Sequence, residues 1–363
     1  AAVAEAAMKS GAARKKITDI ELYKDQLSNR LDPSMSIMQG INAKVRKNPK
    51  RVIFAEGEDE NMLKAAIEFG RNRLGIPILI GAENRVKEQL KKIGLDENYK
   101  IEIVNSTDKE KREKYVKHLY KKLQREGQLE RDVDRLVRND RIAWGSSMIA
   151  CKDADAMVTG NIRHYAASIE KLKKVVEARP GEEIFGMTMI VSKGRTILVA
   201  DTNVTELPSA ERLVNISKSC VRIARLFGFE PKVAFLSHST FGKPLSRNTR
   251  HVRDAIEKLK KEKVDFDFDG EMQPDVALNP IYQEIYPFSK IVGNANVLVM
   301  PALHSAAIST KLMKVFGGGK NIGPLLIGLG QPIEVAPLRA STSEILNLAS
   351  IAAYSSDVID YSN

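Results

Sequence analysis

Short apolar runs alternate with stretches of helical spacing along the first half of the chain. Consecutive or alternating apolar residues predict strands at Arg51–Ala55, Ile76–Ile80 and Ile101–Val104. Each run is followed by a segment whose apolar positions recur every three to four residues, as at Met62–Leu74. Because strands that alternate with helices usually pair in parallel, the pattern predicts an α/β fold with a parallel sheet covered by helices.

A second α/β unit is expected after a break in the pattern near Pro180–Gly181. The apolar runs Ile184–Val191 and Thr196–Asp201, joined by the turn SKGR, predict a hairpin. Helix, strand and helix then alternate again, at Ser209–Phe227, Val233–Ser237 and Asn248–Glu262. The chain is long enough at 363 residues to bury more than one core, which agrees with two units.

The stretch Asn296–Ile345 combines a strand end, a turn, a helix and a glycine run. A buried strand is predicted to end at Pro301, and the turn Ala302–Ser305 follows. Helical spacing predicts a helix over Ile308–Phe316, which the three glycines Gly317–Gly319 would end. In open α/β sheets, ligands bind at strand ends of this kind.

Polar groups in this stretch are candidates for binding an anion. A further strand is predicted at Leu325–Leu329, and it runs into a loop. The glycine-rich run GGGKNIG is neither a Walker A motif nor a GxGxxG fingerprint, so it does not indicate a nucleotide by itself. The candidate residues of the stretch are His304, Ser305, Lys311, Asn321, Gly323 and Arg339.

Composition narrows the class of partner. The net charge is +11, from 57 basic and 46 acidic residues, and the basic residues are spread along helices and mixed with acids. With one Trp and no basic run interleaved with aromatics, the chain favours phosphorylated small molecules and not nucleic acid. No apolar run approaches the roughly 18–20 residues of a membrane span. Two cysteines are too few for a disulfide framework, which indicates a cytoplasmic setting.

The segment VAFLSHSTFGKP, residues 233–244, is a strand that ends in hydroxyl side chains. Ser237, Ser239 and Thr240 offer donors to a phosphate or a thioester, and Lys243 adds a positive charge. The same residues are equally suited to cap and form a turn, and the sequence does not decide between the two roles.

Two other segments carry charged residues beside predicted strands. Arg163 follows a strand and precedes a helix, where it suits an anionic ligand, whereas the neighbouring His164 is at least as well explained as a structural histidine. Asp269, Glu271 and Asp275 follow a short strand; we expect turn acids and helix caps there more than acid/base or metal chemistry. The acids of EGEDEN, residues 56–61, are explained by their position before a helix.

Five motifs, taken in order, resemble the phosphate acetyl/butyryl-transferase family. They are RVIFAEGEDE, DADAMVTGNIRHY, VAFLSHSTFGKP, DGEMQPDVALNP and GGGKNIGPLLIGLGQPI, within residues 45–355. The resemblance implies an isopropylmalate-dehydrogenase-like α/β fold with two domains and a cleft for an acyl-CoA. It places one domain at residues 31–172 plus 326–363 and the other, through which the chain would form a homodimer, at residues 173–325.

Further segments are similar to the C-terminal domain of multimodular NADP-dependent malic enzymes, namely TELPSAERL, ALHSAAISTKL and YPFSKIVGNANVLVMPA. Residues 1–30 resemble the end of their malic-enzyme module and a linker, and the start without Met indicates a piece of a longer protein. The similarity implies an absent module that converts malate to pyruvate and CO2 with NADP and a divalent metal (Mg or Mn), within a larger homo-oligomer. The transferase-like part would need no cofactor and would bind acetyl-CoA.

One departure from the family separates catalysis from sensing. Active transferases carry a Ser-Arg pair where this chain has Pro337 and Leu338, and Arg339 is displaced by one position. Pro has no hydroxyl and Leu no cation, and losing such a clamp typically costs orders of magnitude in rate. We therefore expect a regulatory domain without transferase activity. A one-residue shift of the loop would restore Arg339, so an active phosphate acetyltransferase is the alternative, and a ligand-free dimerisation scaffold is a third.

Overall fold

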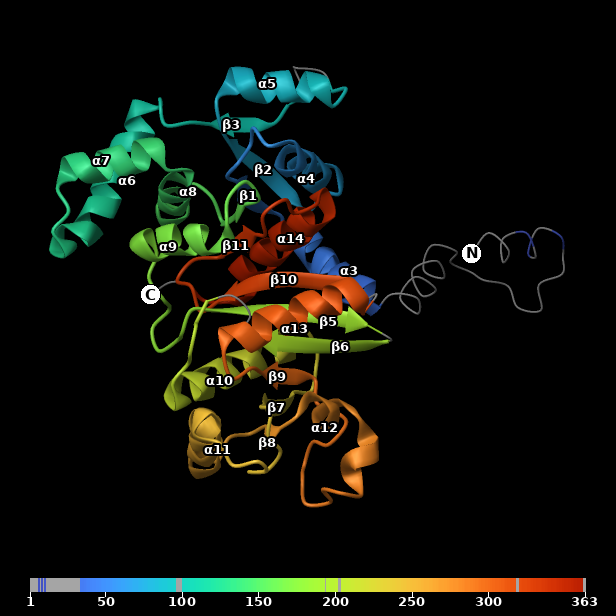
Figure 1. The fold of residues 1–363 in the computed structure, drawn as a ribbon. Helices are drawn as coiled ribbons and strands as arrows, with labels where there is room; N and C mark the ends of the chain where they lie inside the picture. The colour runs from blue at the N-terminus through green and yellow to red at the C-terminus, as the bar shows by residue number, and fades with distance from the viewer. Residues whose placement is uncertain are drawn as a thin grey trace.

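The computed structural model has two β-sheets, and helices pack against both of them (Figure 1). It describes residues 6, 8, 10 and 33–361, except 96–99, 193, 202–203 and 318–319. The predicted linker, residues 1–30, and two of the three glycines at 317–319 therefore lie outside the described residues, apart from the three single positions named. The predicted domain boundaries remain predictions.

Sheet I has five parallel strands in the order β11-β4-β1-β2-β3. Val52, Ile53 and Phe54 of the central strand are fully buried, as expected for a parallel sheet with helices on both faces. The chain passes from β1 to β2 and β3 on one side and returns to β4 on the other, so the strand order reverses between β1 and β4. The strands are β1 Lys50–Phe54, β2 Gly75–Ile80, β3 Glu102–Val104, β4 Ala156–Gly160 and β11 Ile333–Ala336.

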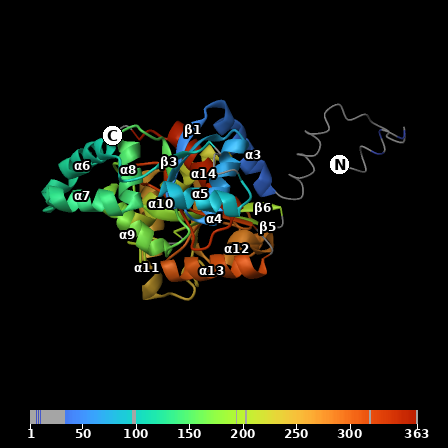
Figure 2. The same ribbon diagram turned by 90° about the horizontal axis from the view of Figure 1, so that it is seen from above.

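Helices cover both faces of sheet I. Side chains that alternate along β1 show which helices lie on each face. Val52 and Phe54 pack with α3, α4, α5 and α14, whereas Ile53 packs with α6, α7, α8 and α9. The two groups lie on opposite sides of the sheet in both ribbon views (Figures 1 and 2). The helices are α3 Pro33–Lys47, α4 Glu60–Arg71, α5 Glu83–Lys92, α6 Lys109–Leu123, α7 Glu130–Asn139, α8 Arg141–Ala150, α9 Tyr165–Val175 and α14 Thr342–Val358.

Sheet II has six strands in the order β10-β5-β6-β9-β7-β8. The predicted hairpin is confirmed as β5 and β6, β10 pairs antiparallel with β5, and the remaining pairs are parallel. Helices α10 and α11 cover one face, and α12 and α13 lie against the other. The elements are β5 Phe185–Ser192, β6 Arg195–Ala200, α10 Ala210–Leu226, β7 Lys232–Leu236, α11 Arg250–Glu262, β8 Asp267–Met272, α12 Pro274–Leu278, β9 Val297–Val299, α13 Leu303–Phe316 and β10 Lys320–Ile327.

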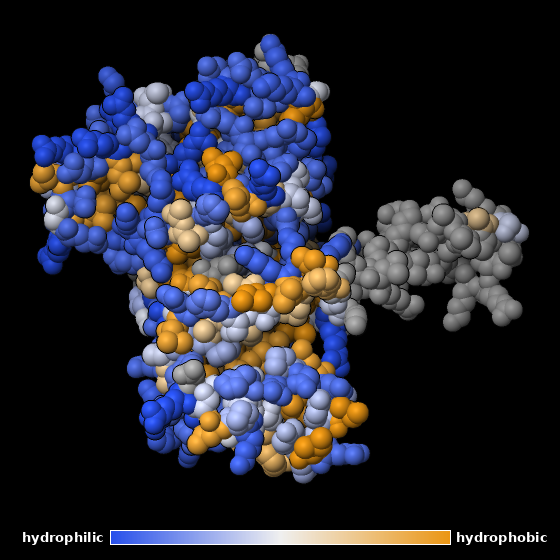
Figure 3. Space-filling view, in the orientation of Figure 1, coloured by the Kyte–Doolittle hydropathy of each residue, from blue (hydrophilic) through white to orange (hydrophobic). Residues whose placement is uncertain are grey.

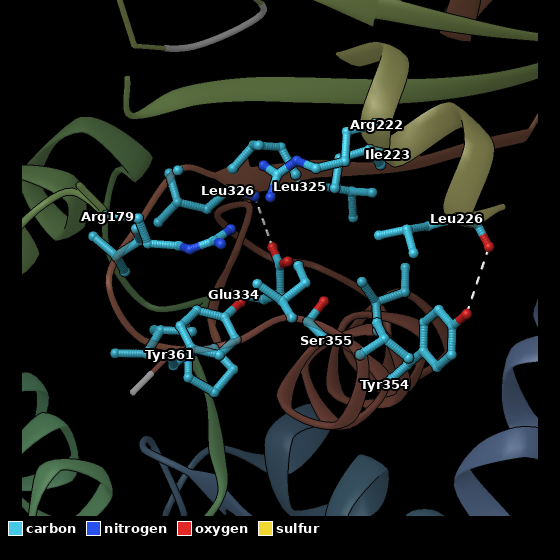
Figure 4. Close-up of a pocket in the computed structure, with 18 of the residues that line it drawn as sticks. Arg179, Arg222, Ile223, Leu226, Leu325, Leu326, Glu334, Tyr354, Ser355 and Tyr361 are labelled. Carbon is cyan, nitrogen blue, oxygen red and sulfur yellow. Dashed lines mark hydrogen bonds between the residues drawn. The ribbon is translucent and has the colours of Figure 1, made fainter. Parts of the chain in front are cut away.

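The two connections between the sheets run side by side and pair with each other. Ala178 and Leu329 form an antiparallel bridge, the Arg179 N–H donates to the Gly328 carbonyl at 2.8 Å, and the Gly330 N–H donates to Glu177 at 2.8 Å. We call residues 177–179 and 328–330 the crossover pair. A small cavity of about 30 Å³ lies beside it, between α10, α14 and Glu334 of β11 (Figure 4). That space suits one or two water molecules and not a cofactor.

The structure corrects three of the predicted elements and adds one strand that was not predicted. Helix α13 begins at Leu303, so the predicted turn Ala302–Ser305 is wrong over its last three residues. Strand β10 begins at Lys320 and not Leu325, because pairing with β5 holds an Asn-Ile-Gly-Pro run extended, with a bulge after Ile322. Strand β11 was not predicted, and Asp269 and Glu271 lie within β8 and not on a turn.

The predicted α/β class with mostly parallel, helix-covered sheets is otherwise confirmed. Among the described residues, no helix is both long and apolar enough to cross a membrane.

Candidate functional site

A buried carboxylate fills the point where the strand order of sheet I reverses. Glu56 follows β1, and its two carboxylate oxygens accept hydrogen bonds of 3.0 Å from Thr159 Oγ1 and from the Gly160 N–H at the end of β4. Ligands of open α/β sheets usually bind in the crevice at this position. Here the protein supplies an anionic side chain of its own, which the sequence pattern explained only as a helix-start acid.

Arg163 lies next to this carboxylate. Its Nη2 is 3.9 Å from Glu56 Oε1, and its side chain remains about a quarter exposed. Burial raises the pKa of Glu56 to about 7, against the opposing effects of Arg163 and of the two hydrogen bonds. Around neutral pH the charge that Arg163 faces therefore changes, so the strength with which it would bind an external anion depends on Glu56.

The loop after β11 is tied to the same place by hydrogen bonds. The Arg339 N–H donates to the Asn161 carbonyl at 2.8 Å, and Asn61 Nδ2 donates to the Ala340 carbonyl at 3.1 Å. Arg339 has a positive φ of 58° and an exposed side chain, while Leu338 is 44% exposed. Arg163 and Arg339, predicted from distant parts of the sequence, thus lie on neighbouring loops at one edge of sheet I.

The hydroxyl residues after β7 form a buried network at the edge of sheet II. Ser239 Oγ donates to Glu271 Oε1 at 3.1 Å and lies 3.0 Å from Ser237 Oγ, and Thr240 Oγ1 accepts from the Gln273 N–H at 3.2 Å. Glu271 also accepts from the Gly242 N–H at 3.0 Å. All three residues are buried, and each hydroxyl has a hydrogen-bond partner within the protein, as a structural role requires.

A hollow of about 770 Å³ opens beside this network, between the ends of β7 and β9 and the starts of α10 and α11. We call it the sheet II hollow. Residues that the sequence analysis did not single out line it together with Ser237; they include His238, Arg247, Arg250 and His251. The signal was present as the run RNTRHVR, but it was interpreted only as the start of a helix.

The remaining predicted residues lie along α13 and β10. His304 and Lys311 are exposed on α13, two turns apart, and Ser305 Oγ donates to the Ala302 carbonyl at 2.8 Å. Asn321 Nδ2 makes a long 3.4 Å contact with the Thr310 carbonyl, and Gly323 adopts a φ of 113° in the bulge of β10. Lys243 is exposed in the turn after β7. The predicted set is therefore divided among the edge of sheet I, the edge of sheet II and the α13 surface.

The described residues were also searched for clusters of possible metal ligands. Among the described residues, no group of three or more His, Cys, Asp or Glu side chains is arranged to hold a metal ion.

The family model described as phosphate acetyl/butaryl transferase matches residues 36–353. The chain belongs to the phosphate acetyl/butyryl-transferase family. This confirms the resemblance that the five sequence motifs carry.

Relatives fall into two groups. The NADP-dependent malic enzyme of Rhizobium meliloti (strain 1021) is 44% identical over 354 residues, which are 97% of this chain and 46% of that protein. The phosphate acetyltransferase of Clostridium acetobutylicum is 30% identical over 326 residues, which are 87% of this chain and 97% of that enzyme. The chain thus spans about half the length of the malic enzymes that it matches.

A solved phosphotransacetylase has the same fold. The crystal structure of the phosphotransacetylase from Streptococcus pyogenes matches with a TM-score of 0.80 and 28% identity, over 89% of this chain and 98% of that one.

Proposed function

We propose that this chain is the regulatory, transferase-like part of an NADP-dependent malic enzyme, which binds acetyl-CoA and carries no transferase activity. One observation supports the proposal most: Leu338, 44% exposed and next to Arg339 in the chain, offers neither charge nor hydrogen bond where the family motif has an arginine. In the proposed arrangement, the loops at this edge of sheet I keep Arg163 and Arg339 but would not offer the group that stabilises the reacting phosphoryl oxygens.

The length of the relatives supports a partner module. Malic enzymes about twice as long match this chain over 97% of its residues. In the proposed arrangement, the partner module oxidises malate to pyruvate and CO2 with NADP and a divalent Mg or Mn ion. After β1 the described residues have Ala55-Glu56-Gly57 with a buried carboxylate in place of a GxGxxG turn, which does not suit a dinucleotide pyrophosphate.

Acetyl-CoA would bind between the edges of the two sheets. Its acyl end would lie near Ser237–Thr240 and near His304 and Ser305, where two strand ends supply backbone and hydroxyl groups. An effector changes activity only through unequal affinity for two states of the protein, so the ligand must favour one relative position of the sheets. The remaining proposed contacts are Arg163, Lys243, Lys311, Asn321, Gly323 and Arg339.

Calorimetry with acetyl-CoA on the 363-residue chain tests the binding. We expect saturable binding, and the same titration with acetate alone to give no heat beyond dilution. An absence of binding at millimolar acetyl-CoA would contradict the proposal.

An active phosphate acetyltransferase is the second candidate, because the Clostridium acetobutylicum enzyme matches over 97% of its own length and Arg339 lies one position from the lost arginine. The discriminating assay measures CoA-dependent release of phosphate from acetyl phosphate. We expect no turnover above the uncatalysed rate. Turnover at more than about 1 s⁻¹, the lower end of ordinary enzyme rates, would establish catalysis.

We further propose that the chain forms a homodimer through sheet II and its helices. Apolar side chains on the outer side of α13, at Ile308, Leu312, Val315 and Phe316, are at least half exposed. Figure 3 shows apolar surface over α13, in a band across the middle of the molecule. The free thiols of Cys151 and Cys220 agree with a cytoplasmic location for the assembly.

A further inference from the structure

The sheet II hollow lies where an α/β fold commonly binds phosphates. It opens at the ends of the parallel strands β7 and β9, next to Ser237 and Pro301. The first turn of α10, a 17-residue helix, borders it at Ser209 and Ala210. Backbone N–H groups and the helix dipole make such a helix start favourable for an anion.

Two arginines at the hollow are free of internal partners. Arg247 and Arg250 line it from the start of α11, both are exposed, and within the described part of the chain neither guanidinium has a hydrogen bond or an ion pair. Their neighbour Arg253 differs, because its Nη1 lies 3.3 Å from Glu271 Oε1. The two free guanidinium groups are therefore available for an external anion.

The other ionisable groups at the hollow leave its charge positive. His238 and His251 add imidazoles, and His251 Nε2 contacts the Pro301 carbonyl at 3.0 Å, which fixes its ring against β9. Asp254 is the carboxylate among the lining residues. Two guanidinium groups thus face one carboxylate, in a volume within the range of pockets that hold cofactor-sized molecules.

Competing cavities fit a nucleotide less well. The cavity at the crossover pair has only about 30 Å³. Two hollows of about 530 and 340 Å³ are lined by arginines that are already paired with carboxylates, Arg222 and Arg179 with Glu182 and Arg225 with Asp265. A hollow of about 270 Å³ at the ends of β2 and β3 is smaller than the sheet II hollow, and its Arg141 is already 3.0 Å from Glu58.

We infer that the sheet II hollow binds the phosphorylated nucleotide end of a CoA thioester, with Arg247 and Arg250 pairing with its phosphates. The inference rests on the proposed function, since Ser237 and Pro301–Ala302 connect the hollow to the proposed acyl position at Ser237–Thr240 and His304–Ser305. Planar guanidinium groups match phosphate oxygens in a bidentate manner, and the two arginines are three residues apart, where one helical turn places both on one side.

The test compares the wild-type chain with the double variant Arg247→Ala, Arg250→Ala. Its matched control is Arg125→Ala, Arg131→Ala, which removes two exposed arginines near α6 and α7 and changes the net charge equally. Titrations use acetyl-CoA, acetyl-dephospho-CoA and adenosine 3′,5′-bisphosphate, and thermal unfolding verifies that each variant is folded. We expect the Kd for acetyl-CoA to rise roughly tenfold per arginine in the double variant and to stay unchanged in the control.

The outcomes separate this inference from the proposed function. Equal acetyl-CoA affinity in the wild type and the double variant would overturn the inference and leave the proposed function standing. Arginine-dependent binding of adenosine 3′,5′-bisphosphate without any binding of acetyl-CoA would support the hollow as a nucleotide site and overturn the proposed function. A failure of all three ligands to bind the wild type would overturn both.

Discussion

At the scale of single residues, Glu56 and Glu334 are two carboxyls whose pKa values are raised by burial in the fold. Glu334 is on β11 beside the crossover cavity, where its Oε2 accepts from the Leu326 N–H at 2.9 Å (Figure 4). Burial raises its pKa to about 8, from 4.5, and that of Glu56 to about 7. In the unfolded chain both carboxyls would ionise near their ordinary pKa, so their protons link stability to pH.

The substitution Glu334→Gln should flatten the pH dependence of stability. Between pH 4.5 and 8 the folded wild type keeps a proton on Glu334 that the unfolded chain releases, so its free energy of unfolding falls as pH rises. The slope from this group is at most about 1.4 kcal/mol per pH unit. Glutamine cannot ionise, so urea titrations at pH 5, 6, 7 and 8 should give a difference between wild type and variant that changes steadily with pH.

Glu170→Gln is the control, because Glu170 is exposed on α9. This variant should follow the wild type at every pH. Parallel pH curves for wild type and Glu334→Gln would show that the pKa of Glu334 is the same in the folded and the unfolded chain, contrary to the effect of its burial.

Sequence reasoning could predict the loss of the Ser-Arg pair, which stays a prediction, but it could not predict the partners of these carboxyls. Pro337 and Leu338 are visible from one aligned motif. Glu56, however, bonds to Thr159 and Gly160, which are 103 and 104 residues away. Likewise the Ser239 hydroxyl donates to Glu271 of β8, so whether it was free for a ligand depended on a strand pairing that the sequence did not reveal.

At the scale of elements, α14 links the candidate site to the core. It begins three residues after Arg339 and packs against α3, α4 and sheet I. Its start is a capping box: Ser341 Oγ accepts from the Glu344 N–H at 3.3 Å, and Glu344 Oε2 accepts from the Ser341 N–H at 2.9 Å. Lys314 of α13 is 3.0 Å from Glu344 Oε1, so the cap also contacts the helix next to sheet II.

Ser341→Ala should destabilise the protein by about 1 kcal/mol, the usual cost of removing a serine N-cap. The free energy of unfolding from urea denaturation at pH 7 measures this effect. Ser343→Ala is the matched control, since Ser343 is exposed in the same first turn and outside the cap. Equal stability of the two variants would mean that the cap contributes nothing and that tertiary packing alone fixes the helix start.

Strands with a clear run of apolar residues could be predicted from the sequence. Strands that form mainly because they pair with a neighbouring strand could not. The runs at β1 and β2 have consecutive apolar residues, so their periodicity is clear. By contrast β10 contains Asn321, Gly323 and Pro324, which disfavour a strand, and antiparallel pairing with β5 overrides these preferences. Strand β11 is four residues long and buried, too short for a periodic signal.

At the scale of the whole molecule, the crossover pair is the covalent link between the sheets. Gly328 lies within it with a φ of 82°, and a Cβ there would come within 2.0 Å of the Glu183 carbonyl oxygen. Both the backbone conformation and the contact require glycine at this position.

Gly328→Ala should therefore lower the free energy of unfolding by several kcal/mol, more than left-handed strain alone would cost. Gly228 provides the control: its φ is 83°, and a Cβ there would meet nothing within 4 Å. Gly228→Ala should cost only about 1–2 kcal/mol. Thermal unfolding of both variants measures the difference, and equal melting temperatures would indicate that the crossover pair can shift to accommodate a methyl group.

The proposed dimer would form through the apolar side of α13. Its exposed residues follow the spacing i, i+4, i+7 and i+8, which places them on one side of the helix, and Ile281, Ile285 and Phe288 add exposed apolar surface after α12. A patch of this kind on a soluble protein marks an interface, and a second copy of the chain can cover it symmetrically. We therefore expect a dimer at micromolar concentration that Leu312→Glu dissociates, because the substitution would place a charge in the contact. Sedimentation velocity measures the change from dimer to monomer. Leu129→Glu is the matched control, since Leu129 and Leu312 are each 51% exposed and Leu129 precedes α7, beside sheet I. If Leu312→Glu sediments as a dimer, or Leu129→Glu dissociates instead, the α13 surface is not the interface.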